Sequence, residues 1–200
     1  MTMVRVRREI ELAVLRVGVR GWWRFRRNPA RAAISDRAFV GPGALLAPWS
    51  AVAPGAVVAP GAVVAPCAAV APGAVLTPGA VISPLSVVAP GAVVGPGAVV
   101  SPLTFVSPGV FIGPGAFIGP GTALAPGVVI GRGAVIEAGV ALAPGVRVGA
   151  GARIEAGNAL APAAVVEAGA VLPHGTNLRP RQHHAATARP EVPALPLSSG

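Results

Sequence analysis

The chain has 200 residues, a formal net charge of +9 and a single cysteine, Cys67, which excludes an internal disulfide framework. The charge is unevenly distributed. Residues 1–37 contain ten Arg against three acidic residues, whereas residues 38–131 contain no Asp, Glu, Lys, Arg or His. A partner attracted by positive charge would therefore meet the first 37 residues. The chain has no Lys at all, which excludes Schiff-base and P-loop lysine chemistry.

Residues 1–33 form the expected basic head. Val6, Ile10 and Val14 fall near helical spacing, which predicts a short amphipathic helix over about 4–17. The segment behind it is rich in Trp and Arg, residue types that suit an anionic membrane surface: Arg20, Trp22, Trp23, Arg24, Phe25, Arg26 and Arg27. The same types could stack on nucleic acid, which we regard as the weaker interpretation. A third interpretation is that the head caps the first coil of the domain that follows.

The sequence gives no sign of export or of a membrane-spanning helix. Glu9 and Glu11 precede the first apolar stretch and Arg16 interrupts it, unlike a secretory signal peptide. In the body of the chain, Pro recurs nearly every six residues, which breaks any apolar helix long enough to cross a bilayer. We therefore expect a cytoplasmic protein, with membrane association through the head as an addition to that expectation.

The body carries a repeat of six residues. From Ile34 to Asn177, 144 residues divide into 24 blocks, and every block begins with Ile, Val or Leu. The commonest block, Val-Ala-Pro-Gly-Ala-Val, joins a β-favouring centre to a Pro-Gly turn, so each block predicts a short strand and a bend. Departures from this block, such as Trp49, Cys67 and Leu85, recur every 18 residues. Three strands per coil and eight coils predict a triangular prism about 38 Å long.

Two segments carry a resemblance to a known family. Ile130-Gly-Arg-Gly-Ala-Val-Ile136-Glu-Ala-Gly and Val148-Gly-Ala-Gly-Ala-Arg-Ile154-Glu-Ala-Gly resemble the bacterial hexapeptide-repeat superfamily. The resemblance covers about residues 34–178 and implies an all-β, left-handed parallel β-helix. In that fold the first residue of each block points inward and the sixth points outward. Residues 179–200 read as a disordered, Pro-rich tail.

The outward positions are unusually apolar for a monomer. They are mostly Val, and Phe105, Phe111 and Phe117 occupy three successive blocks, so these rings should encircle the prism at one level. We take the three Phe as candidates for self-association, into either a trimer or a filament.

The resemblance implies two kinds of chemistry. Acyltransferases of the superfamily use a His as general base and bind coenzyme A along the coils, and their coils are interrupted by a loop that this chain lacks. A carbonic anhydrase branch binds zinc through three His. This chain has only His174, His183 and His184, the last two in the expected tail, so we predict no metal site. His174 has no acidic residue or second His placed near it by spacing, and it is a weak candidate for a catalytic base.

We therefore interpret the chain first as a non-catalytic, self-associating β-solenoid scaffold without a cofactor. The alternative is a divergent O- or N-acyltransferase that uses acyl-CoA. A minor alternative is a membrane-surface protein anchored by its Trp/Arg head.

Overall fold

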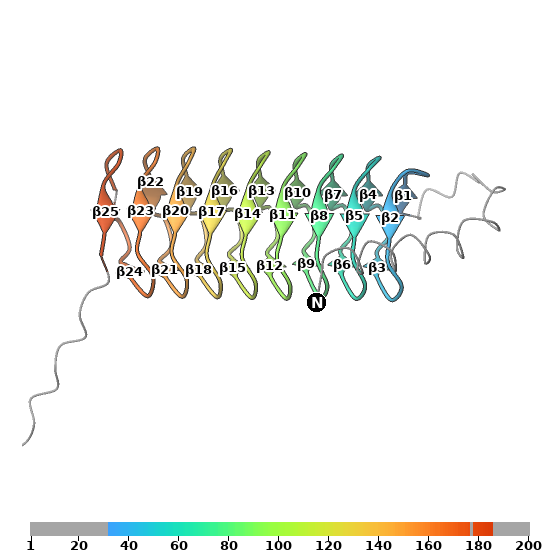
Figure 1. Cartoon of the computed structure of the whole chain (residues 1–200), viewed down its shortest axis with the longest axis horizontal. Coiled ribbons are helices and arrows are strands. Elements are labelled where there is room, and N and C mark those ends of the chain that lie inside the picture. The colour runs from blue at the N-terminus through green and yellow to red at the C-terminus, as the bar shows by residue number, and fades with distance from the viewer. Residues whose placement is uncertain (1–31, 177, 186–200) are drawn as a thin grey trace, which may run out of the picture.

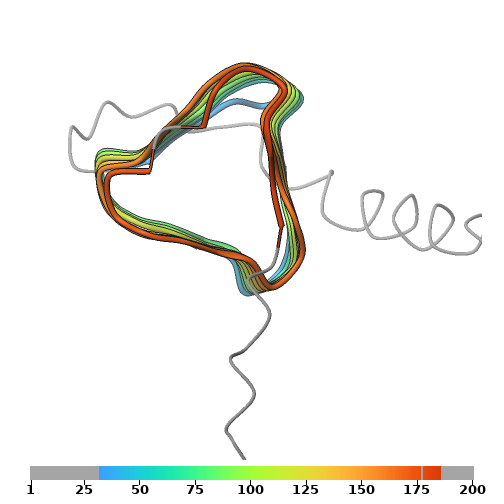
Figure 2. The same cartoon turned by 90° about the vertical axis from the view of Figure 1, so that its left-hand side faces the viewer.

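The structure, a computed structural model, describes residues 32–176 and 178–185, and every regular element in those ranges is a β-strand of two residues. The chain passes through three walls in turn, so hydrogen-bonded neighbours are three strands apart in the sequence, except that the last strand pairs with the strand two before it. Stacked coils form a prism with a triangular cross-section (Figures 1 and 2). The prediction of an all-β parallel β-solenoid of about eight turns is confirmed. The predicted helix over about 4–17 lies outside the described residues.

The three walls are named A, B and C here. Wall A has eight strands: β1 (Ala33–Ile34), β4 (Ala51–Val52), β7 (Ala69–Val70), β10 (Val87–Val88), β13 (Phe105–Val106), β16 (Ala123–Leu124), β19 (Ala141–Leu142) and β22 (Ala159–Leu160). Wall B has nine: β2 (Phe39–Val40), β5 (Val57–Val58), β8 (Val75–Leu76), β11 (Val93–Val94), β14 (Phe111–Ile112), β17 (Val129–Ile130), β20 (Arg147–Val148), β23 (Val165–Val166) and β25 (His183–His184). Wall C has eight: β3 (Leu45–Leu46), β6 (Val63–Val64), β9 (Val81–Ile82), β12 (Val99–Val100), β15 (Phe117–Ile118), β18 (Val135–Ile136), β21 (Arg153–Ile154) and β24 (Val171–Leu172).

Parallel pairing between coils follows the 18-residue period of the sequence. Val57 pairs with Val75, for example, and the same offset recurs along each wall. The backbone nitrogen of Val57 donates to the carbonyl of Ala74 at 2.9 Å. These bonds satisfy the polar backbone of strands that are too short to be stable alone.

The core is a column of branched aliphatic side chains. From β4 to β24 the second residue of each strand points inward and is buried, as Val58, Val94 and Ile118 show. Small side chains such as Ala56 and Ala92, just before the strands, fill the space between them and are also buried. This confirms the expectation that the first residue of each block faces inward.

A left-handed turn residue lies between strands in nearly every block. Gly occupies this position in most blocks, but Trp49, Cys67, Leu85 and Leu103 adopt φ values from 58 to 65° at the corner between walls C and A. An L-residue in this region costs roughly 1–2 kcal/mol because Cβ crowds the backbone. The same corner therefore carries a column of strained, exposed side chains in its N-terminal half.

Replacing Leu103 by Gly should stabilise the protein by up to about 1 kcal/mol, because strain is removed and an exposed side chain contributes little burial. Urea unfolding of the Leu103→Gly variant measures the gain. Leu103→Ala keeps Cβ and serves as the matched control, for which no gain is expected. A loss of stability in Leu103→Gly would show that the Leu side chain makes a stabilising contact.

The solenoid extends past the boundary expected at residue 178. Leu178 is buried, and β25 pairs with β23 on wall B. Arg181 takes the left-handed turn position with φ 58°. The expectation that a tail begins at residue 179 is therefore wrong for residues 179–185, and the rest of that segment lies outside the described residues.

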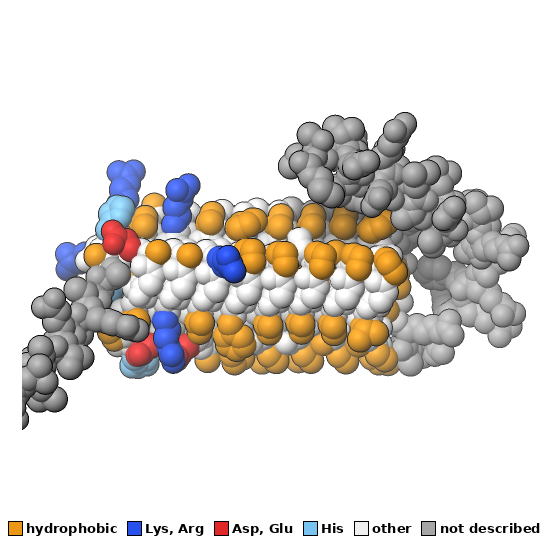
Figure 3. Space-filling model, turned by 60° about the horizontal axis from the view of Figure 1, so that its bottom comes forward, with side chains coloured by type: hydrophobic (Ala, Val, Ile, Leu, Met, Phe, Trp, Pro, Cys, Tyr) orange, Lys and Arg blue, Asp and Glu red, His pale blue; other side chains and the backbone are white. Residues whose placement is uncertain are grey.

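The outer walls are apolar over most of their length. Phe105, Phe111 and Phe117 begin β13, β14 and β15, one on each wall, and are 50%, 44% and 41% exposed. The predicted ring at one level is confirmed, whereas self-association through it stays a prediction. Figure 3 shows rows of hydrophobic side chains along the prism, with charged side chains gathered toward the C-terminal end.

Candidate functional site

A group of polar side chains, here called the polar corner, lies where wall C turns toward wall A near the C-terminal end. Its members are Glu137, Arg153, Glu155, Asn158 and His174. The 18-residue register stacks the first position after β18, β21 and β24, and these positions hold Glu137, Glu155 and Pro173. His174 therefore lies one residue along the same corner.

Arg153 and Glu137 form the ion pair of the polar corner. Arg153 Nε donates to Glu137 Oε1 at 3.0 Å, and Nη2 contacts the same oxygen. The other carboxylate oxygen accepts from the backbone nitrogen of Ala156 at 3.3 Å. The side chains of Arg153 and Glu137 are 57% and 29% exposed, so the pair contributes well under about 1 kcal/mol to stability. Its effect is to bridge two coils at the turn.

His174 is held at two points. Its backbone nitrogen donates to Glu155 Oε2 at 2.9 Å, and its ring Nδ1 lies 2.5 Å from the carbonyl oxygen of Ala156. A carbonyl oxygen can only accept, so Nδ1 carries the hydrogen in this contact. In the neutral ring, Nε2 then keeps its lone pair and is the basic nitrogen. The imidazole is exposed, so Nε2 is accessible to a small molecule.

Asn158 supports the corner from inside. It is buried, and its Nδ2 donates to the carbonyls of Glu155 at 2.9 Å, Pro173 at 3.0 Å and Leu172 at 3.3 Å. Asn158 thus ties together the two turns that carry Glu155 and His174. Earlier coils use hydroxyl groups at the same position, as when Thr122 Oγ1 donates to the carbonyl of Gly119 at 2.7 Å.

The polar corner corrects one expectation from the sequence. His174 was expected to have no acidic residue placed near it, yet Glu155 accepts from its backbone nitrogen. The signal was present, because 155 plus one period of 18 gives 173, the residue before His174. The support that Asn158 gives to two turns was not predicted from the sequence.

The other predicted sites fare differently. The Trp/Arg segment from Arg20 to Arg27 lies outside the described residues. His183 and His184 were expected in a tail, but they form β25, a strand of the solenoid. His184 Nε2 lies 3.2 Å from the carbonyl of Val171. Within residues 32–176 and 178–185, no three His, Cys, Asp or Glu side chains gather closely enough to hold a metal ion. In the same ranges, no helix is long and apolar enough to cross a membrane.

The chain folds as a β-solenoid that is built from repeats of six residues. Residues 109–144 match the model of the family described as bacterial transferase hexapeptide (six repeats). No curated protein sequence matches the chain.

Solved structures share the fold at low sequence identity. The UDP-N-acetylglucosamine acyltransferase of Francisella novicida is 12% identical, with a TM-score of 0.62 over 78% of this chain and 63% of that one. This chain therefore spans less than two thirds of that enzyme. A Bacillus cereus protein assigned to the acetyltransferases is 13% identical, with a TM-score of 0.51 over 77% of this chain and 72% of that one. At such identities the likeness establishes the fold alone.

Proposed function

We propose that the protein is an acyltransferase that uses His174 as general base to transfer an acyl group from a coenzyme A thioester to a hydroxyl or amine. The observation that carries the proposal is the contact between His174 Nδ1 and the Ala156 carbonyl, which leaves Nε2 as the base. The family match and the shared fold of two proteins assigned to acyl transfer support the same class of reaction.

The reaction needs one group that takes a proton and returns it. His174 Nε2 would remove the proton of the acceptor hydroxyl or amine while the acceptor atom forms a bond to the thioester carbonyl carbon. The imidazolium would then give this proton to the departing thiolate as the carbon–sulfur bond breaks. The Ala156 carbonyl, which faces Nδ1–H, would stabilise the charged ring between these two transfers.

Glu155 and Asn158 act on the position of the ring and do not touch it. The carboxylate of Glu155 holds the His174 backbone nitrogen, and the buried amide of Asn158 holds the carbonyls of both turns. Arg153 keeps Glu137 on the neighbouring turn, which fixes the Ala156 amide. We therefore describe these four as positioning residues.

The test uses the full chain with acetyl-CoA and a longer acyl-CoA, together with a panel of free and nucleotide-linked sugars that includes UDP-N-acetylglucosamine. Chromatography follows CoA release and mass spectrometry identifies an acylated acceptor. Equal amounts of both products would support the proposal. If calorimetry detects no binding of either thioester at millimolar concentration, the proposal is wrong.

Gly157 offers a sharp test of the ring position. It has φ +70°, and a Cβ added there would lie 3.0 Å from His174 Cε1. Gly157→Ala should therefore displace the imidazole and lower the acyl-transfer rate by about tenfold or more, as expected for a misplaced catalytic group. Gly139 has φ +67° one coil earlier, and a Cβ there meets nothing within 4 Å.

Gly139→Ala is thus the matched control. Both variants should lose about 1–2 kcal/mol from backbone strain, as measured by urea unfolding. Only Gly157→Ala should lose activity. Equal acyl-transfer rates in the two variants would show that His174 takes no part in catalysis.

A self-associating scaffold is the second candidate function. The exposed ring of Phe105, Phe111 and Phe117 on an uncharged stretch of solenoid favours it. A protein that forms filaments or arrays in electron micrographs and shows no thioester binding would favour this function over acyl transfer.

A further inference from the structure

Wall A differs from the other two walls in the residues it presents to the outside. Its eight outward positions are small except for two near the middle: Ala33, Ala51, Ala69, Val87, Phe105, Ala123, Ala141 and Ala159. Walls B and C present mainly Val, Phe, Leu and Arg at the equivalent positions. Wall A is therefore the smoothest side of the prism, and the ring of Phe105 is its main projection.

Wall A is also free of charge. Beyond residue 131, outward Arg residues occur on the other walls, as Arg147 on wall B and Arg153 on wall C. No charged residue lies on wall A from Ala51 to Ala159, or in the turns that lead from it to wall B over the same coils. The acidic residues that border wall A, Glu137 and Glu155, lie in the turns that lead into it from wall C, so a partner confined to the wall itself covers no charged side chain among the described residues.

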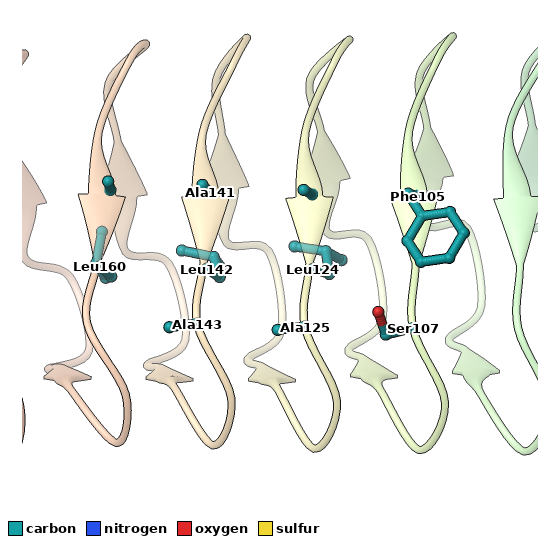
Figure 4. A pocket seen from close by; sticks show the side chains of 10 residues that line it. Phe105, Ser107, Leu124, Ala125, Ala141, Leu142, Ala143 and Leu160 are labelled. Carbon is teal, nitrogen blue, oxygen red and sulfur yellow. The ribbon is translucent and has the colours of Figure 1, made fainter.

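Beside Phe105 the wall is hollowed. An open hollow of about 410 Å³ runs along β16, β19 and β22, lined by Ala123, Ala141, Ala159 and the alanines of the following turns, with Phe105 at one end. In Figure 4 the Phe105 ring lies at the end of the row that carries Ala141, and Ala143, Ala125 and Ser107 form a second row beside it. A projection and a recess thus lie next to each other on one apolar wall.

We propose that wall A binds wall A of a second copy of this chain, related by a two-fold axis that lies between the two walls and runs parallel to their strands, so that the two prisms are antiparallel. An isologous contact brings the same patch of both copies together. The projection of each copy can then fill the recess of the other. A parallel, in-register contact would place Phe105 against Phe105 of the partner subunit and leave both recesses open. The antiparallel two-fold arrangement is the one that fills them.

The register of the contact follows from the strand spacing. Phe105 is on the fifth strand of wall A, and the hollow spans the sixth to the eighth. An axis through Ala123, on the sixth strand, places Phe105 opposite Ala141 of the partner subunit, on the seventh. About five strands then overlap, a face of about 24 Å by 15 Å. Two such faces bury at least roughly 700 Å², so the dimer should be weak and depend on concentration.

Sedimentation velocity of the full chain over a wide concentration range tests the proposal, which does not depend on catalysis. The wild type should shift from monomer to dimer as concentration rises. Ala141→Arg should abolish the shift by placing a charge in the hollow, and Phe105→Ala should weaken it by about tenfold or more. Val129→Arg, at an exposed position of wall B, is the matched control and should leave the dimer unchanged.

A cross-linking measurement tests the symmetry. In a Cys67→Ser background, Ala123→Cys lies on the axis, so a short bis-maleimide should join two copies through this one residue. Val129→Cys in the same background should not cross-link. A protein that stays monomeric at all concentrations overturns the proposal, as does a trimer or an association that survives Ala141→Arg. An Ala123→Cys thiol that does not react with maleimide would show that another segment or partner covers the wall, which also overturns it.

Discussion

Replacement of His174 by Ala is expected to lower the rate of acyl transfer by about 10²–10⁴-fold, the usual contribution of a general base. The substitution removes Nε2 and also the Nδ1 contact to the Ala156 carbonyl. The side chain is exposed and follows the last strand of wall C, so the fold should tolerate its loss. The measurement is the rate of CoA release with the acceptor found for the wild type, beside a urea unfolding curve.

The interpretation of this experiment depends on two further variants. His174→Gln keeps a polar side chain that can donate to the carbonyl but offers no basic nitrogen, so its rate should be as low as that of His174→Ala. His183→Gln changes the exposed His of β25 and should retain the wild-type rate. Wild-type activity in His174→Gln would show that the residue contributes no proton transfer.

A second large effect is expected from neighbouring residues of β15. Ile118 is fully buried, whereas Phe117 points outward and is 41% exposed. Ile118→Ala should lower the free energy of unfolding by about 2–5 kcal/mol, because the rigid coils above and below leave a cavity. Phe117→Ala removes a larger side chain, yet it should cost at most about 1 kcal/mol because the ring is 41% exposed.

Urea unfolding of both variants measures this difference. The comparison is controlled internally, since both residues lie in the same two-residue strand and share its backbone bonds. If Phe117→Ala were the more destabilising change, the assignment of inward and outward positions would be reversed. A large loss that depends on protein concentration would instead indicate that Phe117 is buried in an assembly.

The sequence predicts the solenoid well because one constraint is repeated in every block. A buried aliphatic residue every six positions and a coil every 18 fix the register, so the inward position of Val58 and the ring that contains Phe105 follow by arithmetic. The constraint fails at His184, which occupies the place of the aliphatic residue. For that reason the last strand could not be found from the pattern.

The polar corner was harder to predict than the walls. The 18-residue period stacks Pro173 on Glu155. His174 lies beside Glu155 because it is the residue that follows Pro173. The contact of Nδ1 with the Ala156 carbonyl depends on a side-chain rotamer, which the repeat does not determine. The three carbonyls bound by Asn158 likewise depend on how closely the turns approach each other.

The central claim is that His174 is held with its proton on Nδ1 and a basic lone pair on Nε2. Long-range proton–nitrogen NMR of the full chain labelled with ¹⁵N-histidine reports this directly, with His174 assigned by comparison with His174→Gln. The account predicts that neutral His174 is in the Nδ1–H form. The Nε2–H form, or a mixture typical of a free imidazole, would contradict it.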